Sequence, residues 1–151
     1  MNMPKINLDY GPMIRLAVIS LLLCGLLFPL AVTGVAQVLM PYQANGEILR
    51  LNGRAIGSNL IAQNFISPMF FHSRNATESA SGVDPDIPLQ DAYSQIPRIQ
   101  AATGISSDQL EQIVNQNIER TLWITGDPYV NVLRLNLILV QQYPSVYASF
   151  T

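Results

Sequence analysis

Charged side chains are scarce in this chain, and several residue types occur only once. Charged residues make up 12% of the 151 residues, and the formal net charge is −2. Lys5 is the sole lysine and the arginines are scattered, so the sequence lacks the basic patch typical of nucleic-acid binding. A single histidine, His72, and a single cysteine, Cys24, cannot form a common zinc site or an internal disulfide. We therefore expect no nucleic-acid partner and no metal cofactor.

Sequence motifs of the common catalytic sites are also missing. The chain has no glycine-rich phosphate loop and no Asp-Lys-Thr-Gly-Thr sequence, the phosphorylation site of P-type pumps. Asp84, Asp86 and Asp91 lack the spacing of a calcium loop, so turn and capping roles are expected for them. His72 and Arg74 together suit an anion, although such a pair more often belongs to a solvated loop. We predict no catalytic residues, and therefore no enzyme activity for the isolated chain.

The longest feature present is an uncharged run over residues 16–40. A helix of this length crosses the ~30 Å hydrocarbon core of a bilayer, and a helix is the only spanning form open to a single segment. We predict a short N-terminal segment over residues 1–15, a transmembrane helix over residues 16–40 and a soluble domain over residues 41–151. The length of the last part suits one small domain.

A cleaved signal peptide is the main alternative to this anchor. The small residues 34–36 resemble a cleavage site, but the apolar run continues to Met40 and is longer than the typical h-region of a signal peptide, so a retained anchor is favoured. Arg15 flanks the run on one side, with Lys5 beyond it, whereas the nearest basic residue on the other side is Arg50. This bias predicts a single-pass cell-membrane protein with a cytoplasmic N-terminus and an extracytoplasmic domain.

Small side chains cluster on one face of the predicted span. Pro29 cannot donate to the carbonyl of Gly25, so a kink is expected there. Small residues permit close approach by another transmembrane helix, although alanine and glycine are common in any such helix. The candidate contacts for a partner helix are Ala17, Ser20, Cys24, Gly25 and Ala31.

The domain begins with the signature of a β-hairpin. Asn52-Gly53 separates two apolar-rich runs, residues 47–51 and 54–58, and both turn residues accept positive φ. A two-residue turn pairs Leu51 with Arg54 and Leu49 with Ile56. The apolar residues 60–71 follow, with Phe70 and Phe71 expected in the core, and residues 72–88 are expected to form a long loop.

Two amphipathic helices are predicted next. The first runs from Pro88 to about Thr103, and Gly104 suits its end. Its apolar stripe is predicted to comprise Leu89, Ala92, Tyr93, Ile96, Ile99 and Ala102. The second begins at Ser106, which has capping-box spacing to Gln109.

The last part of the chain mixes strand and helix signals. A strand is expected over residues 121–125, a turn over residues 126–128, and a buried segment that begins with Asn131 as a helix cap. With the hairpin and the two helices, this predicts a small mixed α/β (α+β) domain after the single transmembrane helix.

Several segments in order resemble one family, the C subunit of the Kdp potassium-transporting P-type ATPase. They are residues 28–30, 43–46, 57–65, 71–74, 81–85, 95–99 and 126–137. Two departures stand out: Ser73 replaces a usual glycine, and a longer stretch that most members carry after Arg74 is nearly deleted.

The resemblance implies a non-catalytic accessory subunit of an ATP-driven, high-affinity potassium uptake pump. Its partners would be a channel-like subunit that selects potassium, the transported ion, and a pump subunit that hydrolyses ATP. The family is thought to support assembly and to raise the pump's ATP affinity, with Gln63 as the nucleotide contact. Because the charge bias puts the domain outside, we expect a role in assembly or gating rather than direct ATP binding. The alternative is a free membrane-anchored or secreted binding module without a pump.

Overall fold

The computed structural model describes residues 10–74, 81–122 and 125–150. The chain divides into two compact units, Met1–Asn45 and Gly46–Thr151.

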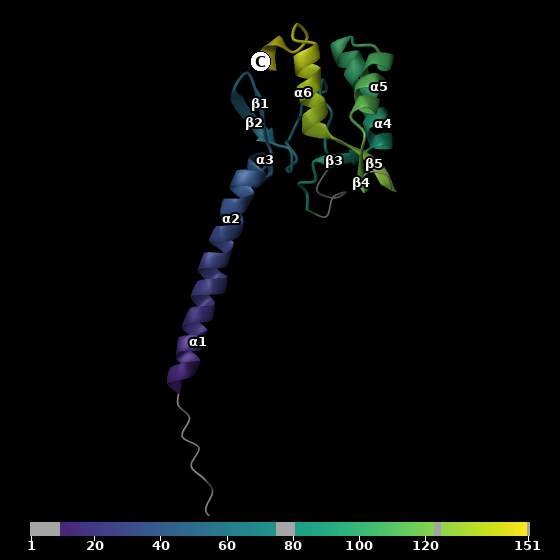
Figure 1. Cartoon of the computed structure of the whole chain (residues 1–151). Helices are drawn as coiled ribbons and strands as arrows, with labels where there is room; N and C mark the ends of the chain where they lie inside the picture. Colours follow the sequence, from purple (N-terminus) through teal and green to yellow (C-terminus); the bar gives the residue numbers. More distant parts are fainter. Residues whose placement is uncertain (1–9, 75–80, 123–124, 151) are drawn as a thin grey trace, which may run out of the picture. The chain divides into compact units, whose positions relative to one another are not determined.

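The first unit is dominated by one long helix. It comprises α1 (Tyr10–Leu22), the π-helical turn η1 (Leu23–Leu27) and α2 (Phe28–Leu39), followed by the short helix α3 (Pro41–Ala44) (Figure 1). The continuous helix Tyr10–Leu39 is long and apolar enough to cross a membrane. None of its residues is buried within the described part of the chain, so its apolar surface is left to lipid or to other proteins.

The π-helical turn accommodates Pro29 at the point where the sequence predicted a kink. The N–H of Phe28 donates to the carbonyl of Leu23, so the helix continues although Pro29 has no N–H to donate. One extra residue in the turn rotates all later residues by about 100°. Ala31 is therefore turned away from the face of Ala17, Ser20 and Cys24, and the predicted face of small residues is not continuous.

The β-hairpin forms as predicted, but with a different register. Strands β1 (Ile48–Leu51) and β2 (Arg54–Ser58) are antiparallel, and Asn52 and Gly53 adopt φ of 51° and 81°. Leu51 pairs with Arg54 as expected. The predicted pair of Leu49 with Ile56 is wrong, because a β-bulge after Leu49 places Gly57 opposite it.

A second sheet joins strands that are distant in sequence. Its order is β3 (Asp86–Pro88), β5 (Thr125–Asn131) and β4 (Glu119–Leu122), all antiparallel. The predicted turn over residues 126–128 is wrong, since those residues lie inside β5. The predicted strand over residues 121–125 is divided between β4 and β5, and residues 123–124 lie outside the described residues. Strand β3 falls at the end of the expected loop and was missed.

The three helices of the domain form largely as predicted. Helices α4 (Leu89–Thr103) and α5 (Ser107–Gln116) are separated by Gly104 at φ 75°, and the Ser106–Gln109 capping box is present. Tyr93 and Ala102 are exposed, so the buried stripe of α4 is Ala92, Ile96 and Ile99. Helix α6 (Val132–Gln142) begins at Asn131, whose side chain accepts the N–H of Arg134, and the short 3-10 helix η2 (Ala148–Phe150) follows it.

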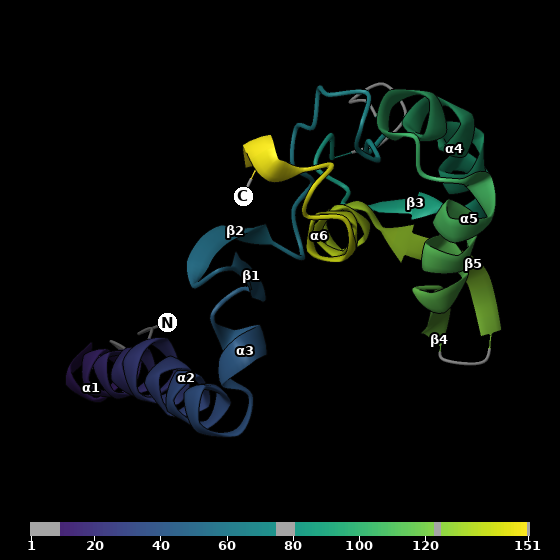
Figure 2. The same ribbon diagram turned by 90° about the horizontal axis from the view of Figure 1, so that it is seen from above.

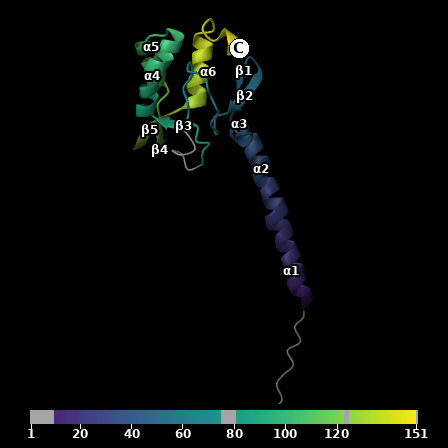
Figure 3. The same ribbon diagram turned by 180° about the vertical axis from the view of Figure 1, so that it is seen from behind.

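Helix α6 is the centre of the domain. Seen from above, it lies between the β1–β2 hairpin and the pair α4 and α5 (Figure 2), and the view from behind shows the same order (Figure 3). Buried residues of α4, α5, α6 and β5 form the core together with Phe70, Phe71 and Tyr147. One apolar N-terminal helix followed by a mixed helix and strand domain agrees with the predicted class.

Candidate functional site

Gln63 lies in the segment after β2, close to Gly57 of the hairpin and Leu133 of α6. Its Nε2 donates to the carbonyl of Ile61 at 3.1 Å. A Cβ on Gly57 would stand 3.0 Å from Cδ of Gln63 and 3.1 Å from Cδ2 of Leu133, so a larger residue at this position would require these side chains to shift. Gln63 is therefore half-buried between the hairpin and α6.

A polar cavity of about 250 Å³ lies beside Gln63. Its lining includes His72, Ser73 and Arg74, so the structure brings three segments of the resemblance to one place. Arg74 is the one arginine or lysine among the described lining residues. Its Nε lies 3.6 Å from Oδ2 of Asp91. Pockets for drug-sized ligands are typically about 300–1,000 Å³, so this cavity is small for a nucleotide. Nucleotide contact at Gln63 stays a prediction.

Arg98 ties the neighbouring loop together, and we call its contacts the Arg98 junction. Its guanidinium donates to the carbonyls of Pro68 at 2.7 Å and Phe70 at 3.0 Å, and to Oε1 of Gln95 at 2.8 Å. Gln95 in turn accepts the N–H of His72 and donates to its carbonyl. Burial lowers the pKa of Arg98. The charge of Arg98 thus stabilises backbone carbonyls inside the domain.

His72 and Arg74 each contact another residue of the domain. Nε2 of His72 lies 2.9 Å from the carbonyl of Ser67, and Arg74 faces Asp91. The two side chains are therefore engaged separately in this structure.

Asn131 connects three parts of the domain, and we call its contacts the Asn131 junction. Its Nδ2 donates to the carbonyl of Asn59 and to Oδ1 of Asp86, both at 2.9 Å, while its Oδ1 caps α6. The residue is 5% exposed. Burial raises the pKa of Asp86, and the hydrogen bond from Asn131 opposes that rise. The junction fixes the segment after β2 against β3 and the start of α6.

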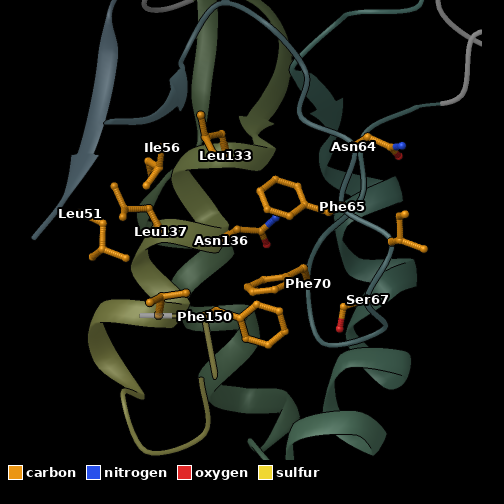
Figure 4. Close-up of a pocket in the computed structure, with 12 residues that line it drawn as sticks. Leu51, Ile56, Asn64, Phe65, Ser67, Phe70, Leu133, Asn136, Leu137 and Phe150 are labelled. Carbon is orange, nitrogen blue, oxygen red and sulfur yellow. The ribbon is translucent and has the colours of Figure 1, made fainter. Parts of the chain in front are cut away.

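An apolar cavity of about 370 Å³ separates the hairpin from α6 (Figure 4). Its walls include Leu51 and Ile56 from the hairpin, Phe65 and Phe70 from the loop, and Leu133 and Leu137 from α6. Sequence reasoning missed this cavity, because its lining comes from four separate segments and no local pattern marks it.

The predicted partner-helix contacts all belong to the first unit, Met1–Asn45. Ala17, Ser20, Cys24, Gly25 and Ala31 are all exposed on the long helix. In the described residues no group of three or more histidines, cysteines or carboxylates is placed to hold a metal ion.

Comparison with known proteins matches most of the sequence, from the long helix into α6. The family described as "K+-transporting ATPase, c chain" matches residues 10–78 and 75–141. The potassium-transporting ATPase KdpC subunit of Koribacter versatilis is 33% identical over 83% of this chain and 91% of the relative. That of Caldanaerobacter subterraneus is 30% identical over 85% and 93%, and KdpC subunit 2 of Staphylococcus aureus is 31% identical over 82% and 94%.

The comparisons also locate the segment that this chain lacks. The three alignments extend over 175 to 179 residues, although this chain has 151, so the relatives carry residues without a counterpart here. The two family matches meet at residues 75–78, where the deletion after Arg74 was expected. With these matches over most of its length, the chain belongs to the KdpC family, the c chains of K+-transporting ATPases.

Proposed function

We propose that this chain is the non-catalytic accessory subunit of an ATP-driven, high-affinity potassium uptake pump. Membership in the KdpC family supports a place in such a complex, beside a channel-like and an ATP-hydrolysing subunit. The observation that carries the non-catalytic role is the use of polar side chains in the domain. In the segments of the resemblance, Arg98, Gln95, Asn131 and Asn136 bond to groups of the domain itself. Because these side chains serve the domain's own fold, we infer that the domain acts by binding partner subunits through its surface.

The pump assay tests this role directly. We expect potassium-stimulated ATPase activity in vesicles that contain the complete complex, and its loss when this chain is omitted. Full activity without the chain would refute the accessory role. Purification of the chain from solubilised membranes without any large polytopic partner would favour the free binding module instead.

We place the domain outside the cell on the basis of Arg15 at the N-terminal end of the long helix. In right-side-out cells, an external protease is expected to cut the domain while leaving the helix in the membrane. A domain that is protected in intact cells and cut only after lysis would show the opposite orientation.

The long helix is proposed to assemble with a transmembrane helix of the channel-like subunit through Ala17, Ser20, Cys24 and Gly25. Replacing Cys24 and Gly25 with leucine keeps the helix apolar but blocks close approach. We expect at least tenfold less complex with unchanged membrane insertion. Gly34→Leu is the matched control, because the π-helical turn places Gly34 roughly opposite that face and a Cβ added there meets no atom within 4 Å. Equal loss in both variants would refute a specific contact.

An effect on ATP affinity is proposed to be indirect. Gln63 borders a small cavity beside one ion-paired arginine, which is little positive charge for a triphosphate. We expect Gln63→Ala to leave the ATP concentration for half-maximal rate within twofold, as does the exposed control Gln112→Ala. A clear rise with Gln63→Ala alone, at normal assembly and potassium response, would show direct nucleotide contact.

A further inference from the structure

The apolar cavity between the hairpin and α6 has no charged wall. Among its described lining residues there is no aspartate, glutamate, lysine, arginine or histidine. Its volume of about 370 Å³ lies within the range of pockets that hold small molecules. Two lining residues, Ile66 and Phe150, are 81% and 47% exposed, so the cavity opens to solvent. A ligand that enters it is therefore held without ion pairs.

The polar side chains of the lining are bonded within the domain or point away from the cavity. The amide of Asn136 bonds to the N–H and the carbonyl of Phe71, both at 2.8 Å. Oγ of Ser67 accepts the N–H of Met69 at 3.4 Å. Asn64 is exposed, and its amide points away from the cavity (Figure 4). Because a water molecule in a cavity needs about two to four polar partners, this lining favours an apolar occupant over water.

The cavity has one aromatic and one aliphatic wall (Figure 4). In the aromatic wall, the ring centroid of Phe70 lies 5.3 Å from that of Phe65 and 4.9 Å from that of Phe150. These ring contacts hold the aromatic wall together. The facing aliphatic side chains come from the hairpin and α6 and include Leu51, Ile56, Leu133 and Leu137. The space between the walls is thus lined by hydrocarbon on both sides.

The lining residues of α6 give the cavity a direction. They run from Leu133 to Val140, which lie about 10 Å apart along the helix axis. A linear hydrocarbon chain laid along this wall brings no polar group into the cavity. An extended peptide would bring backbone N–H and carbonyl groups, which cost free energy when they are buried without partners. Since the polar side chains of the described lining are bonded or point away, the cavity suits an alkyl chain better than a peptide.

We propose that this cavity binds a single alkyl chain between its two walls, with the polar end of the ligand in the water at the open side. Burial of the methylene groups supplies the binding free energy, because the lining carries no charge. The ligand class is therefore a neutral or amphiphilic molecule with one hydrocarbon chain in the cavity. The site lies wholly within the domain, so the proposal does not rest on the pump role.

Photolabelling of the full chain tests the site. The chain in phosphatidylcholine nanodiscs is irradiated with decanol that carries a diazirine near its methyl end, and mass spectrometry locates the labelled residues. Two variants fill the cavity from different elements, Leu137→Trp on α6 and Ile56→Trp on the hairpin. Gln112→Trp on α5 is the matched control, because Gln112 is exposed and does not line the cavity. Thermal unfolding identifies the variants that are folded, and two filling variants guard against the failure of one.

We expect label on the lining residues, reduced at least fivefold by a folded filling variant and by excess unlabelled decanol, and changed less than twofold by Gln112→Trp. Label on the lining that neither folded filling variant reduces would overturn the proposal.

A second arm replaces decanol with phosphatidylcholine that carries the diazirine on an acyl chain. Label from this probe would support the site and identify membrane lipid as the source of the chain, whereas label from decanol alone would identify a free ligand. Absence of label on the lining with both probes would overturn the proposal. Loss of all lining label in the assembled complex would show that a partner protein fills the cavity and would also overturn it.

Discussion

The two most apolar helices of this chain have opposite surroundings. Helix α6 buries six of its residues, including Leu135 and Leu139 at 0% exposure. The helix Tyr10–Leu39 buries none within the described part of the chain. Apolar composition alone therefore does not decide whether a helix joins a core. Helix length is a major factor, because the 11 residues of α6 are too few to cross a bilayer whereas the 30 residues of the anchor are enough.

The two helices also differ in whether they carry a buried polar side chain. In α6, Asn136 is 2% exposed, and its amide bonds to the N–H and the carbonyl of Phe71, both at 2.8 Å. A buried amide costs free energy unless it is bonded, so Asn136 specifies one partner and one rotation of α6. Among the described residues of the long helix, Tyr10–Leu39, no side chain is buried, so no buried amide of this kind fixes its rotation.

The largest expected effect separates the two helices directly. Leu139→Ala removes a fully buried side chain of α6 and should lower the free energy of unfolding of the domain by about 3 kcal/mol. Leu22→Ala in the anchor, where Leu22 is 50% exposed, should change it by less than about 0.5 kcal/mol. Urea unfolding of the full chain in detergent, followed by domain fluorescence, measures both. Similar losses of unfolding free energy in the two variants would contradict the difference in burial between the two helices.

The next effect concerns what fixes the start of α6. Asn131→Ala removes the helix cap and both donors of the Asn131 junction, so we expect a loss of about 2 kcal/mol. Asn131→Asp keeps the cap but places a second carboxylate beside Asp86. That variant should be weakest at neutral pH and recover in acid, whereas the alanine variant should not. Stability of Asn131→Ala close to the parent would show that the junction contributes little.

A smaller effect tests the hairpin, whose degree of burial is intermediate between those of the anchor helix and α6. Gly53 has φ 81° and a Cβ added there would meet no atom within 4 Å, so Gly53→Val introduces backbone strain without a clash. We expect a loss of about 1 kcal/mol in thermal unfolding of the domain. Gly53→Asn should recover most of it, because asparagine tolerates positive φ. An equal loss in both variants would assign the effect to the side chain.

The smallest effect is the pH dependence from Asp86. Burial raises the pKa of Asp86 above its value of 3.8 in the unfolded chain. The native state therefore keeps this proton to higher pH than the unfolded state, and its contribution to stability falls as pH rises from about 3.8 through the native pKa. Asp86→Asn should flatten that slope and change stability at pH 7 by less than about 1 kcal/mol, since the amide oxygen still accepts from Asn131. An unchanged slope between pH 3.5 and 6 would exclude Asp86 as its source.

Short-range features of the fold could be predicted from the sequence. The Asn52-Gly53 turn, the Ser106–Gln109 capping box and the stop at Gly104 each depend on the conformation of one or two residues. The apolar run needs only its length and lack of charge to be identified as a span. The order of the segments from residue 28 to residue 137 was likewise enough to find the family.

Contacts between distant segments were decided only by the tertiary structure. The bulge after Leu49, strand β3 and the residues inside β5 depend on which strands pair, and no local propensity encodes that choice. Asn131 was predicted as a cap, but its bonds to Asn59 and Asp86 join residues 72 and 45 positions away in the chain. Such contacts form only when the whole chain has folded, because each contributes little until its neighbours are in place. The Arg98 junction and the cavity under the hairpin arise in the same way.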